Sequence, residues 1–408
     1  MSLSTAMYSG LSGLNSHGEA MGVVGDNIAN LNTTGFKYSA VHFEDLLAQM
    51  VSTGSGPGQV GRGSRISQIN TVWQQGSLET SADDVDVAIT GIGFLIVKDP
   101  LTNGLYYTRD GNFSLDKDGY LINAHGYRVQ GKAIDPATGT PAGVDTDINI
   151  TQNYSAPRAT TEVEMVLNLD ANAAVGDTYA SALSLYDGLG NIHTLNVVNT
   201  KAGANDWRVS GTLDGIDITA LIADQGGGGP SDLIFNANGT MVSGGLYTID
   251  LSAYNIGNVA LNLRNTSGGN TTQYAASSVT NYASQDGYGP GFLQRLSINN
   301  EGIITGHYSN GQVLPHYQLT LARFNAPGKL FREGSNLYTE TQDSGVALTG
   351  APGTNGLGKI NSNSLEQSNV DLSNEFVHMI LYQRAFQANS RIITTTDSMM
   401  EEVLSLKR

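Results

Sequence analysis

The sequence predicts a mixed α+β fold, in which long N- and C-terminal helices pack in a coiled-coil-like manner and nested, mainly β domains lie between them. Apolar residues recur at helical spacing near both ends of the chain. Between the ends, short apolar or alternating stretches are separated by Gly, Asn and Asp, which is typical of strands and turns. A length of 408 residues allows roughly two to four globular units of ordinary size.

Seven-residue repeats predict the two terminal helices. Repeats sustained over about four heptads favour packing against other helices over a lone surface helix. The C-terminal helix also has a start signal, in which Ser368 caps the helix and Asp371 occupies its third position. The N-terminal repeat is Met7, Leu14, Met21 and Ile28, flanked by Leu11, and the C-terminal repeat is Leu372, Met379, Phe386, Ile393 and Met400, flanked by Phe376 and Leu404.

Five glycines weaken the N-terminal helix as an isolated element. Each costs on the order of 1 kcal/mol relative to alanine in a helix interior, so this segment alone is expected to be largely unfolded in water. Close packing against neighbouring helices both requires glycine and supplies the missing stability. We therefore expect both ends to be disordered in a monomer and helical in an assembly. The five glycines are Gly10, Gly13, Gly18, Gly22 and Gly25.

The middle of the chain is predicted to be nested. Hairpin-type turn signals such as Asp118-Gly119 and Asp187-Gly188 separate its strands, and Gly226–Pro230 is predicted to be a flexible loop. The predicted division is a terminal helical assembly domain over 1–31 and 368–408, an extended linker arm over 32–69, a discontinuous β domain over 70–144 and 285–367, and an inserted outer β domain over 145–284.

Composition excludes several classes of function. A formal net charge of −16, from 21 Lys and Arg against 37 Asp and Glu, opposes binding to nucleic acid. The chain has no Cys, which rules out disulfides, thiol catalysis and Cys-ligated metals. No apolar run approaches the roughly 18 residues that span a bilayer, so no membrane insertion is expected. The first Lys or Arg is Lys37, so a conventional signal peptide is not predicted.

Motifs for catalysis or metal binding are incomplete. Residues 126–133 resemble a phosphate-binding loop but end in Ala133, where a hydroxyl would hold magnesium. Residues 145–156 resemble a calcium loop but carry Ile150 and Ala156 where that loop needs Gly and Glu. Paired carboxylates for glycoside hydrolysis remain open, because the fold rather than the spacing brings such pairs together. We expect no enzyme activity, no cofactor and no metal site.

Both ends of the chain resemble the signatures of bacterial flagellar rod and hook proteins. The N-terminal signature covers residues 9–14 (SGLSGL) and 26–37 (DNIANLNTTGFK), and the C-terminal one covers 368–372 (SNVDL) and 383–390 (QRAFQANS). The one departure is Asp26, where the family usually has Asn. The candidate residues for subunit–subunit assembly are the repeat and flanking positions given above together with Asn27, Asn30, Asn32, Gly35 and Phe36.

The middle of the chain resembles the hook members of this family. The stretches that carry this resemblance are 184–195 (SLYDGLGNIHTL), 285–288 and 308–312, and rod members are generally shorter and lack such an insertion. The resemblance implies a structural subunit of the hook, a curved flexible tube that passes torque from rod to filament as a universal joint. A distal rod subunit, or less readily a secreted β-rich adhesin or glycan-binding protein, remains the alternative.

The same resemblance implies the partners and the location. The partners are many copies of the chain itself in a helical tube, the distal rod protein, the hook cap, the hook–filament junction proteins and the flagellar export apparatus. The implied location is the extracellular part of the flagellum. Export would run through the flagellar secretion channel without a cleaved signal peptide, which agrees with the missing cationic leader.

Overall fold

The computed structural model describes residues 3–53, 56–135, 138–150, 154–224, 232–265 and 269–405. The Gly226–Pro230 loop that the sequence predicts lies outside these residues. By its internal contacts the chain divides into two compact units. The first unit consists of Met1–Thr151, Leu296–Gly306 and Leu314–Arg408, and the second of Gln152–Arg295 and His307–Val313.

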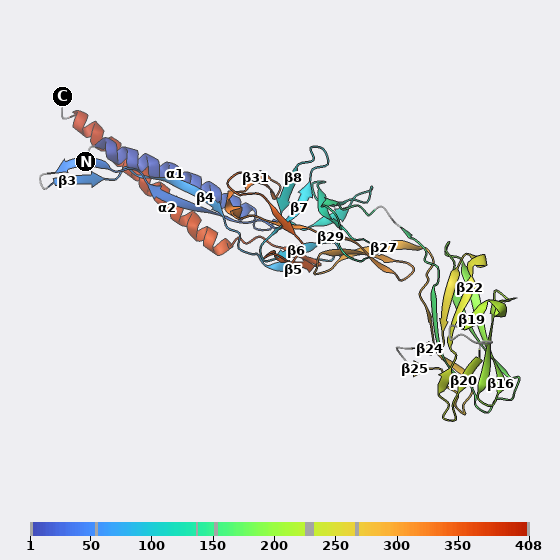
Figure 1. Cartoon of the computed structure of the whole chain (residues 1–408). Helices are drawn as coiled ribbons and strands as arrows, with labels where there is room; N and C mark the ends of the chain where they lie inside the picture. Colours follow the sequence, from blue (N-terminus) through green and yellow to red (C-terminus); the bar gives the residue numbers. More distant parts are fainter. Residues whose placement is uncertain are drawn as a thin grey trace. The chain divides into compact units, whose positions relative to one another are not determined.

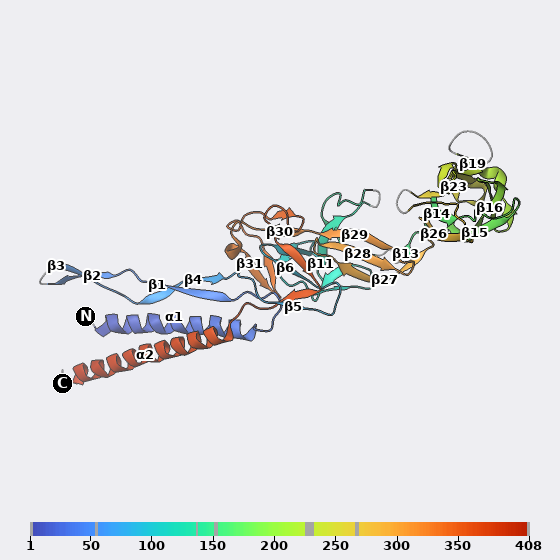
Figure 2. The ribbon, with the colours of Figure 1, turned by 90° about the horizontal axis from the view of Figure 1, so that it is seen from below.

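Two long helices lie side by side in the first unit (Figures 1 and 2). Helix α1 spans Leu3–Ala29 and helix α2 spans Leu372–Ser405. They run antiparallel, because the end of α1 meets the start of α2, whereas Gly10 near the start of α1 faces Ile393 far along α2. Within the described residues, no helix combines the length and the apolarity that crossing a bilayer requires.

Asp371 caps α2. Its Oδ1 atom accepts hydrogen bonds from the backbone N–H groups of Ser373 (2.9 Å) and Asn374 (3.3 Å), which are the second and third positions of the helix. The prediction that Ser368 is the cap is therefore wrong. The Ser368 hydroxyl instead accepts from the N–H of Val370 in the turn that precedes the helix, so the helix begins three residues later than the capping-box spacing indicated.

The residues that follow α1 form an arm, defined here as Ser39–Thr71. Its base is an antiparallel pair of β1 (Ser39–Asp45) and β4 (Ser64–Thr71), and its far end pairs β2 (Gln49–Thr53) with β3 (Gly56–Val60). The arm packs on α1. Gly63, with φ 104°, lies so close to that helix that a Cβ atom there would overlap the Oγ atom of Ser12, so only glycine fits at this approach.

A β-rich body completes the first unit. Its sheet runs in the order β28 (Ile303–Tyr308), β29 (Val313–Leu319), β11 (Arg128–Ala133), β7 (Phe94–Lys98), β8 (Leu105–Thr108), β32 (Leu337–Thr339) and β31 (Phe331–Gly334). By the bounds given above, β13 (Tyr154–Ser155) and most of β27 (Gly291–Ile298), which pair with each other, belong to the second unit. Attached to it are β9 (Phe113–Leu115), β10 (Leu121–Asn123), β12 (Thr146–Asp147), β30 (Leu321–Arg323) and β33 (Leu348–Gly350). A 3-10 turn, η3, covers Pro327–Lys329.

Two short ladders join segments that are far apart in the sequence. Strand β5 (Leu78–Thr80) pairs with β35 (Ser364–Glu366), and β6 (Val87–Thr90) pairs with β34 (Lys359–Ser362). Because β35 ends only a few residues before α2 begins, this pairing fixes the start of that helix against the β-rich body.

The second unit is a sandwich of two sheets around one core. The five-stranded sheet runs β19 (Ile222–Asp224), β22 (Leu246–Leu251), β23 (Gly257–Asn262), β14 (Glu162–Asn168), β26 (Val279–Gln285). The other runs β15 (Thr178–Tyr186), β16 (Ile192–Gly203), β17 (Asp206–Leu213), β20 (Asp232–Phe235), β21 (Met241–Ser243), with β18 (Ile216–Asp217) beside β17. Smaller elements are β24 (Arg264–Asn265), β25 (Gly269–Asn270), η1 (Thr219–Leu221) and η2 (Ser252–Tyr254).

The core of this sandwich contains Trp207 and Tyr247, both almost completely buried. Alternation along the strands supplies the core, because every second residue faces inward. The predicted turn at Asp187-Gly188 is confirmed. Asp187 joins β15 to β16, and its Oδ1 atom accepts from the N–H groups of Leu189 and Asn191.

Candidate assembly surfaces

The face that α1 turns toward α2 is made largely of small residues. Ala20 is completely buried. A Cβ atom at Gly13 would lie 2.6 Å from Nδ2 of Asn389, and one at Gly10 would lie 3.2 Å from Cγ1 of Ile393. Glycine at these two positions therefore lets α1 and α2 of one copy approach closely.

Two further glycines of α1, Gly22 and Gly25, face open space. A Cβ atom at Gly22 or Gly25 would have no neighbouring atom within 4 Å, and both residues are exposed. Helix propensity alone disfavours glycine there, and no contact within the described part of one copy requires it. This exposed glycine face is the first surface that a single copy leaves uncovered.

The predicted repeats are only partly covered within one copy. Phe386 and Ile393 face α1, where they approach Gly18 and Gly10. Half-buried members are Leu14, Met21, Ile28 and Met379, whereas Met7, Leu11, Leu372, Phe376, Met400 and Leu404 are exposed. The uncovered positions stay candidates for contacts between copies.

A second apolar face of α2 lies outside the seven-residue repeat, and of its members only Val403 is predicted as flanking that repeat. Its members all exceed a third of their full exposure and share one side of the helix at helical spacing. Large exposed apolar faces mark interaction sites. The signal was present in the sequence, one or two positions away from the predicted stripe. The members are Val377, Leu381, Ile392, Met399 and Val403.

Asn27 ties together α1, the arm and α2. Its side chain is 1% exposed. Its Nδ2 atom donates to the Ser39 carbonyl (2.9 Å) and to Glu375 Oε2 (3.2 Å), and its Oδ1 atom accepts from the Ser39 N–H (2.9 Å). This signature residue therefore holds three elements in one arrangement through three buried hydrogen bonds.

The other signature residues lie just beyond the end of α1. Asn30 donates to the Asp26 carbonyl and accepts from Thr33 Oγ1, Phe36 is buried, and Asn32 is exposed. Gly35 has φ 69°, and a Cβ atom there would lie 2.7 Å from the backbone nitrogen of Asp110. The buried contacts of Asn27, Gly35 and Phe36 lie within one copy.

A buried ion cluster lies where the arm meets the β-rich body. Lys37 pairs with Glu366 Oε1, and Arg109 Nη1 pairs with Glu366 Oε2 at 3.3 Å. The side chains of Lys37 and Glu366 are 0% exposed and that of Arg109 is 4% exposed. Burial lowers the pKa of the Lys37 ammonium group, and the Glu366 carboxylate opposes that shift.

Backbone groups complete the cluster. Lys37 Nζ donates to the Gln74 carbonyl (2.8 Å), and the Gly76 N–H donates to Glu366 Oε1 (2.9 Å). Sequence reasoning missed this cluster. Two signals were available. Lys37 is the last residue of the N-terminal signature, and Arg109 lies inside the stretch 107–113 (YTRDGNF).

His17 lies in an aromatic cluster between three elements. Its ring centroid is 5.2 Å from that of Phe43 on β1 and 5.9 Å from that of Tyr382 on α2. The His17 Nδ1 atom is buried, and no hydrogen bond to it is found among the described residues. Burial lowers the pKa of His17, so the neutral ring is the form that this packing favours.

Replacing His17 by Gln should make the packing of α1, α2 and the arm less sensitive to acid. Because the pKa is lowered by folding, the unfolded chain takes up the proton first, and stability is lost as the pH falls below the ordinary value of about 6.5 toward the folded value. Denaturant unfolding followed by helix circular dichroism at about pH 7 and about pH 5 measures this loss. The exposed His42, changed to Gln, is the control. Equal acid sensitivity of wild type and His17→Gln would contradict the assignment.

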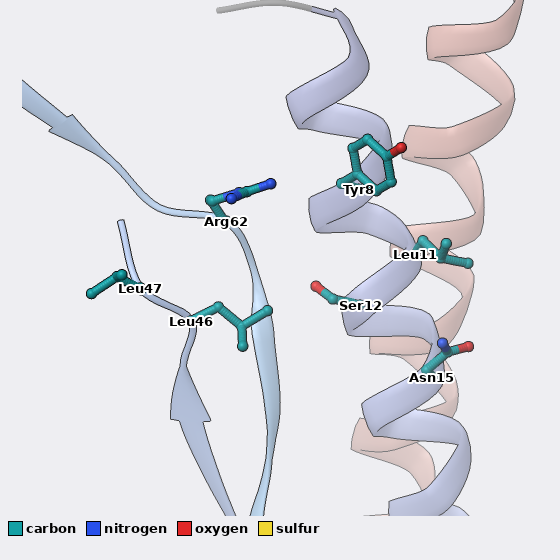
Figure 3. A pocket seen from close by; sticks show the side chains of 7 residues that line it. All are labelled: Tyr8, Leu11, Ser12, Asn15, Leu46, Leu47 and Arg62. Atoms are coloured by element: carbon teal, nitrogen blue, oxygen red, sulfur yellow. The ribbon is translucent and has the colours of Figure 1, made fainter. Parts of the chain in front are cut away.

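A pocket opens between α1 and the arm (Figure 3). It has a volume of about 420 Å³. Its lining includes exposed apolar side chains, of which Leu47 is 92% exposed, and one cation. The lining residues are Tyr8, Leu11, Ser12 and Asn15 from α1 and Leu46, Leu47 and Arg62 from the arm. Among the described residues, no group of three or more His, Asp or Glu side chains could hold a metal ion.

Protein-family profiles match most of the chain. Residues 7–37 match the flagella basal body rod protein family and residues 361–406 the flagellar basal body rod FlgEFG protein C-terminal family. Residues 88–163 match the flagellar hook protein FlgE/F/G D1 domain, and residues 149–288 the flagellar basal body protein FlaE D2 domain. The two terminal matches contain all of α2, α1 from residue 7 onward, and the signatures quoted above.

Full-length relatives agree with the profiles. Flagellar hook protein FlgE of Borreliella burgdorferi is 34% identical, over 98% of this chain and 99% of that protein. FlgE of Escherichia coli K12 is also 34% identical, over 98% of this chain and 100% of that protein. The crystal structure of Helicobacter pylori flagellar hook protein FlgE2 shares the fold, with a TM-score of 0.51 and 16% identity over 71% of this chain and 100% of that one. The chain belongs to the flagellar hook protein family.

Proposed function

We propose that this chain is a structural subunit of the bacterial flagellar hook, polymerising into a curved, flexible tube that transmits torque from rod to filament as a universal joint. The observation that carries the proposal is identity of 34% to hook proteins over nearly the whole chain. The match to residues 149–288 favours a hook subunit over a distal rod subunit, because the inserted region is included. The family is structural, and an enzymatic role has no support from it.

The two terminal helices supply the contacts of the proposed polymer. We propose coiled-coil-like packing of α1 and α2 from many copies, in a heterologous arrangement that stays open and therefore grows. The exposed glycine face of α1 and the exposed apolar face of α2 support this, since each lacks a partner within the described part of one copy. Of the predicted assembly positions, those that one copy leaves exposed take part in these contacts, namely Met7, Leu11, Leu372, Phe376, Met400 and Leu404.

The remaining parts of the proposal concern organisation and export. We propose the division that the sequence predicts, with a terminal helical domain over 1–31 and 368–408, a linker arm over 32–69, a discontinuous β domain over 70–144 and 285–367, and an inserted outer β domain over 145–284. Its partners besides its own copies are the distal rod, the hook cap, the junction proteins and the export apparatus. Export as an unfolded chain is supported by the glycines of α1, which make that helix weak in isolation, and by the absence of Cys.

Electron microscopy of the purified full-length chain tests this function. Wild-type chain should form curved tubes, because the exposed helix faces then become buried between copies. Separate deletion of residues 1–30 and of residues 371–408 should abolish the tubes, because each deletion removes one of the two faces. Uncharged osmolytes that strengthen burial of apolar surface favour polymerisation.

Each other outcome has a defined meaning. Straight, rigid tubes would indicate a rod subunit. Compact monomers or trimers, with ends already protected from protease, would contradict polymerisation and favour the adhesin class. If the deletion variants still form tubes, the contacts that hold the tube together lie between β domains rather than between helices.

A further inference from the structure

We propose that the pocket between α1 and the arm receives the last turns of α2 from a second copy, with Glu402 of that copy pairing with Arg62. This inference rests on the proposed polymerisation and names one contact within it. The pocket supplies apolar surface and one positive charge. The end of α2 supplies exposed apolar side chains and a negative charge.

The pocket side has an unused cation beside exposed apolar groups. Arg62 is exposed, and no ion pair or hydrogen bond of its side chain is found among the described residues. The neighbouring Arg65 is paired with Glu44 instead. Tyr8 is 64% exposed and Leu47 92% exposed, so both leave apolar surface open at this pocket. In Figure 3 the guanidinium group of Arg62 points toward α1, where Tyr8 lies.

The α2 side presents a complementary set of residues. Met399, Glu402 and Val403 are spaced i, i+3 and i+4, so they are neighbours on the helix surface. Met399 is 53% exposed and Val403 56% exposed. Glu402 is exposed, and no ion pair of its carboxylate is found within the described chain. An apolar pair with one carboxylate at its edge fits an apolar pocket with one guanidinium group at its edge.

The occupant comes from another copy, because the end of α2 has no helix packed against it among the described residues of its own copy. The antiparallel pairing brings Asn27 to Glu375 and Gly10 to Ile393. Continued at the same pitch, this pairing places Leu3 opposite about residue 400, so the last turn of α2 extends past the described start of α1. The pocket faces the arm, whereas α2 runs along another side of α1 (Figure 3). The end of α2 therefore cannot reach the pocket of its own copy without leaving that pairing.

Charge reversal tests the pair. Arg62→Glu and Glu402→Arg should each raise the critical concentration for polymerisation by about tenfold, since each places like charges in contact. The double variant Arg62→Glu with Glu402→Arg should recover most of that loss. Glu401→Arg is the matched control, because residue 401 lies about 100° around the helix from residue 402. An uncharged osmolyte drives polymerisation without screening the pair.

Introduced cysteines test the contact by a separate readout. The natural chain has no Cys, so Leu47→Cys and Val403→Cys in one chain form the only thiol pair. Oxidised polymer should give a ladder of covalently joined chains on a denaturing gel, whereas dilute monomer should give none. Circular dichroism of each variant monomer verifies that its fold is retained.

Several outcomes would overturn the inference. They are a Glu402→Arg variant that behaves like Glu401→Arg, a double variant that is not restored, and a cross-link that closes within single chains. If wild-type chain does not polymerise at all, the proposed function fails. If wild-type chain polymerises and the charge variants do so equally well, only this contact fails.

Discussion

Glu366→Gln should lower the free energy of unfolding of the first unit by about 3–5 kcal/mol and leave the second unit unchanged. The substitution removes the negative charge that both Lys37 and Arg109 contact. Both cations then remain buried without a counter-charge, and such a broken buried pair is far more costly than an intact pair is favourable. The expected loss is a large fraction of the stability of an ordinary domain.

The two tryptophans allow each unit to be measured separately. Trp73 belongs to the first unit and Trp207 to the core of the second, and the chain has no other. Glu366→Gln is therefore placed in two backgrounds, Trp207→Phe and Trp73→Phe. Denaturant unfolding followed by fluorescence should show a lower midpoint when Trp73 reports and an unchanged midpoint when Trp207 reports.

Glu79→Gln is the control for this change. Glu79 lies on β5, the strand that pairs with β35, and is exposed, so the same chemical change should cost less than about 0.5 kcal/mol. Adding Lys37→Met to Glu366→Gln should recover part of the loss, because it removes one uncompensated charge. Equal effects of Glu366→Gln and Glu79→Gln would show that the ion cluster does not hold this junction.

The helices themselves were predictable, whereas their contact faces were not. Residues 1–31 and 368–408 were predicted to be helical, and α1 and α2 span Leu3–Ala29 and Leu372–Ser405. Apolar periodicity shows that one face of a helix is to be buried, but it does not show which surface packs against that face. Met7 and Leu11 were predicted as contact residues, yet in one copy they are exposed while Gly10 and Gly13 face α2. The glycines did predict close contact with another helix, and for Gly10 and Gly13 that helix is α2 of the same copy; the sequence did not show which helix it would be.

The ion cluster could not be predicted, because its members are far apart in the sequence and no local pattern links them. Lys37 and Glu366 are 329 positions apart, and charged side chains are almost never fully buried unless they are paired. Their meeting requires the arm, the β5–β35 ladder and the strand that leads to Arg109 to be in place together. The arm likewise was predicted to be extended but not to be paired, because Gly- and Ser-rich strands give a weak pairing signal.

Replacing both Gly22 and Gly25 by alanine should stabilise the lone helix and impair the polymer. Within one copy the new methyl groups meet no atom within 4 Å, and each substitution should favour the helix by about 1 kcal/mol. In the proposed tube another helix closes on this face. The added methyl groups then cost about 1–3 kcal/mol per site through overpacking, which corresponds to a rise in critical concentration of about fivefold to 150-fold per site.

The opposite signs of these two effects make the test decisive. Circular dichroism of the monomer should show higher helix content and a higher melting temperature, and sedimentation should show less polymer at equal concentration. Gly328→Ala is the control, because a Cβ atom there also meets no atom within 4 Å but lies away from both helices, in η3. A double variant that gains helix and still polymerises at the wild-type concentration would place this face of α1 outside every contact between copies. The exposed glycines would then serve export or folding of the chain rather than its assembly.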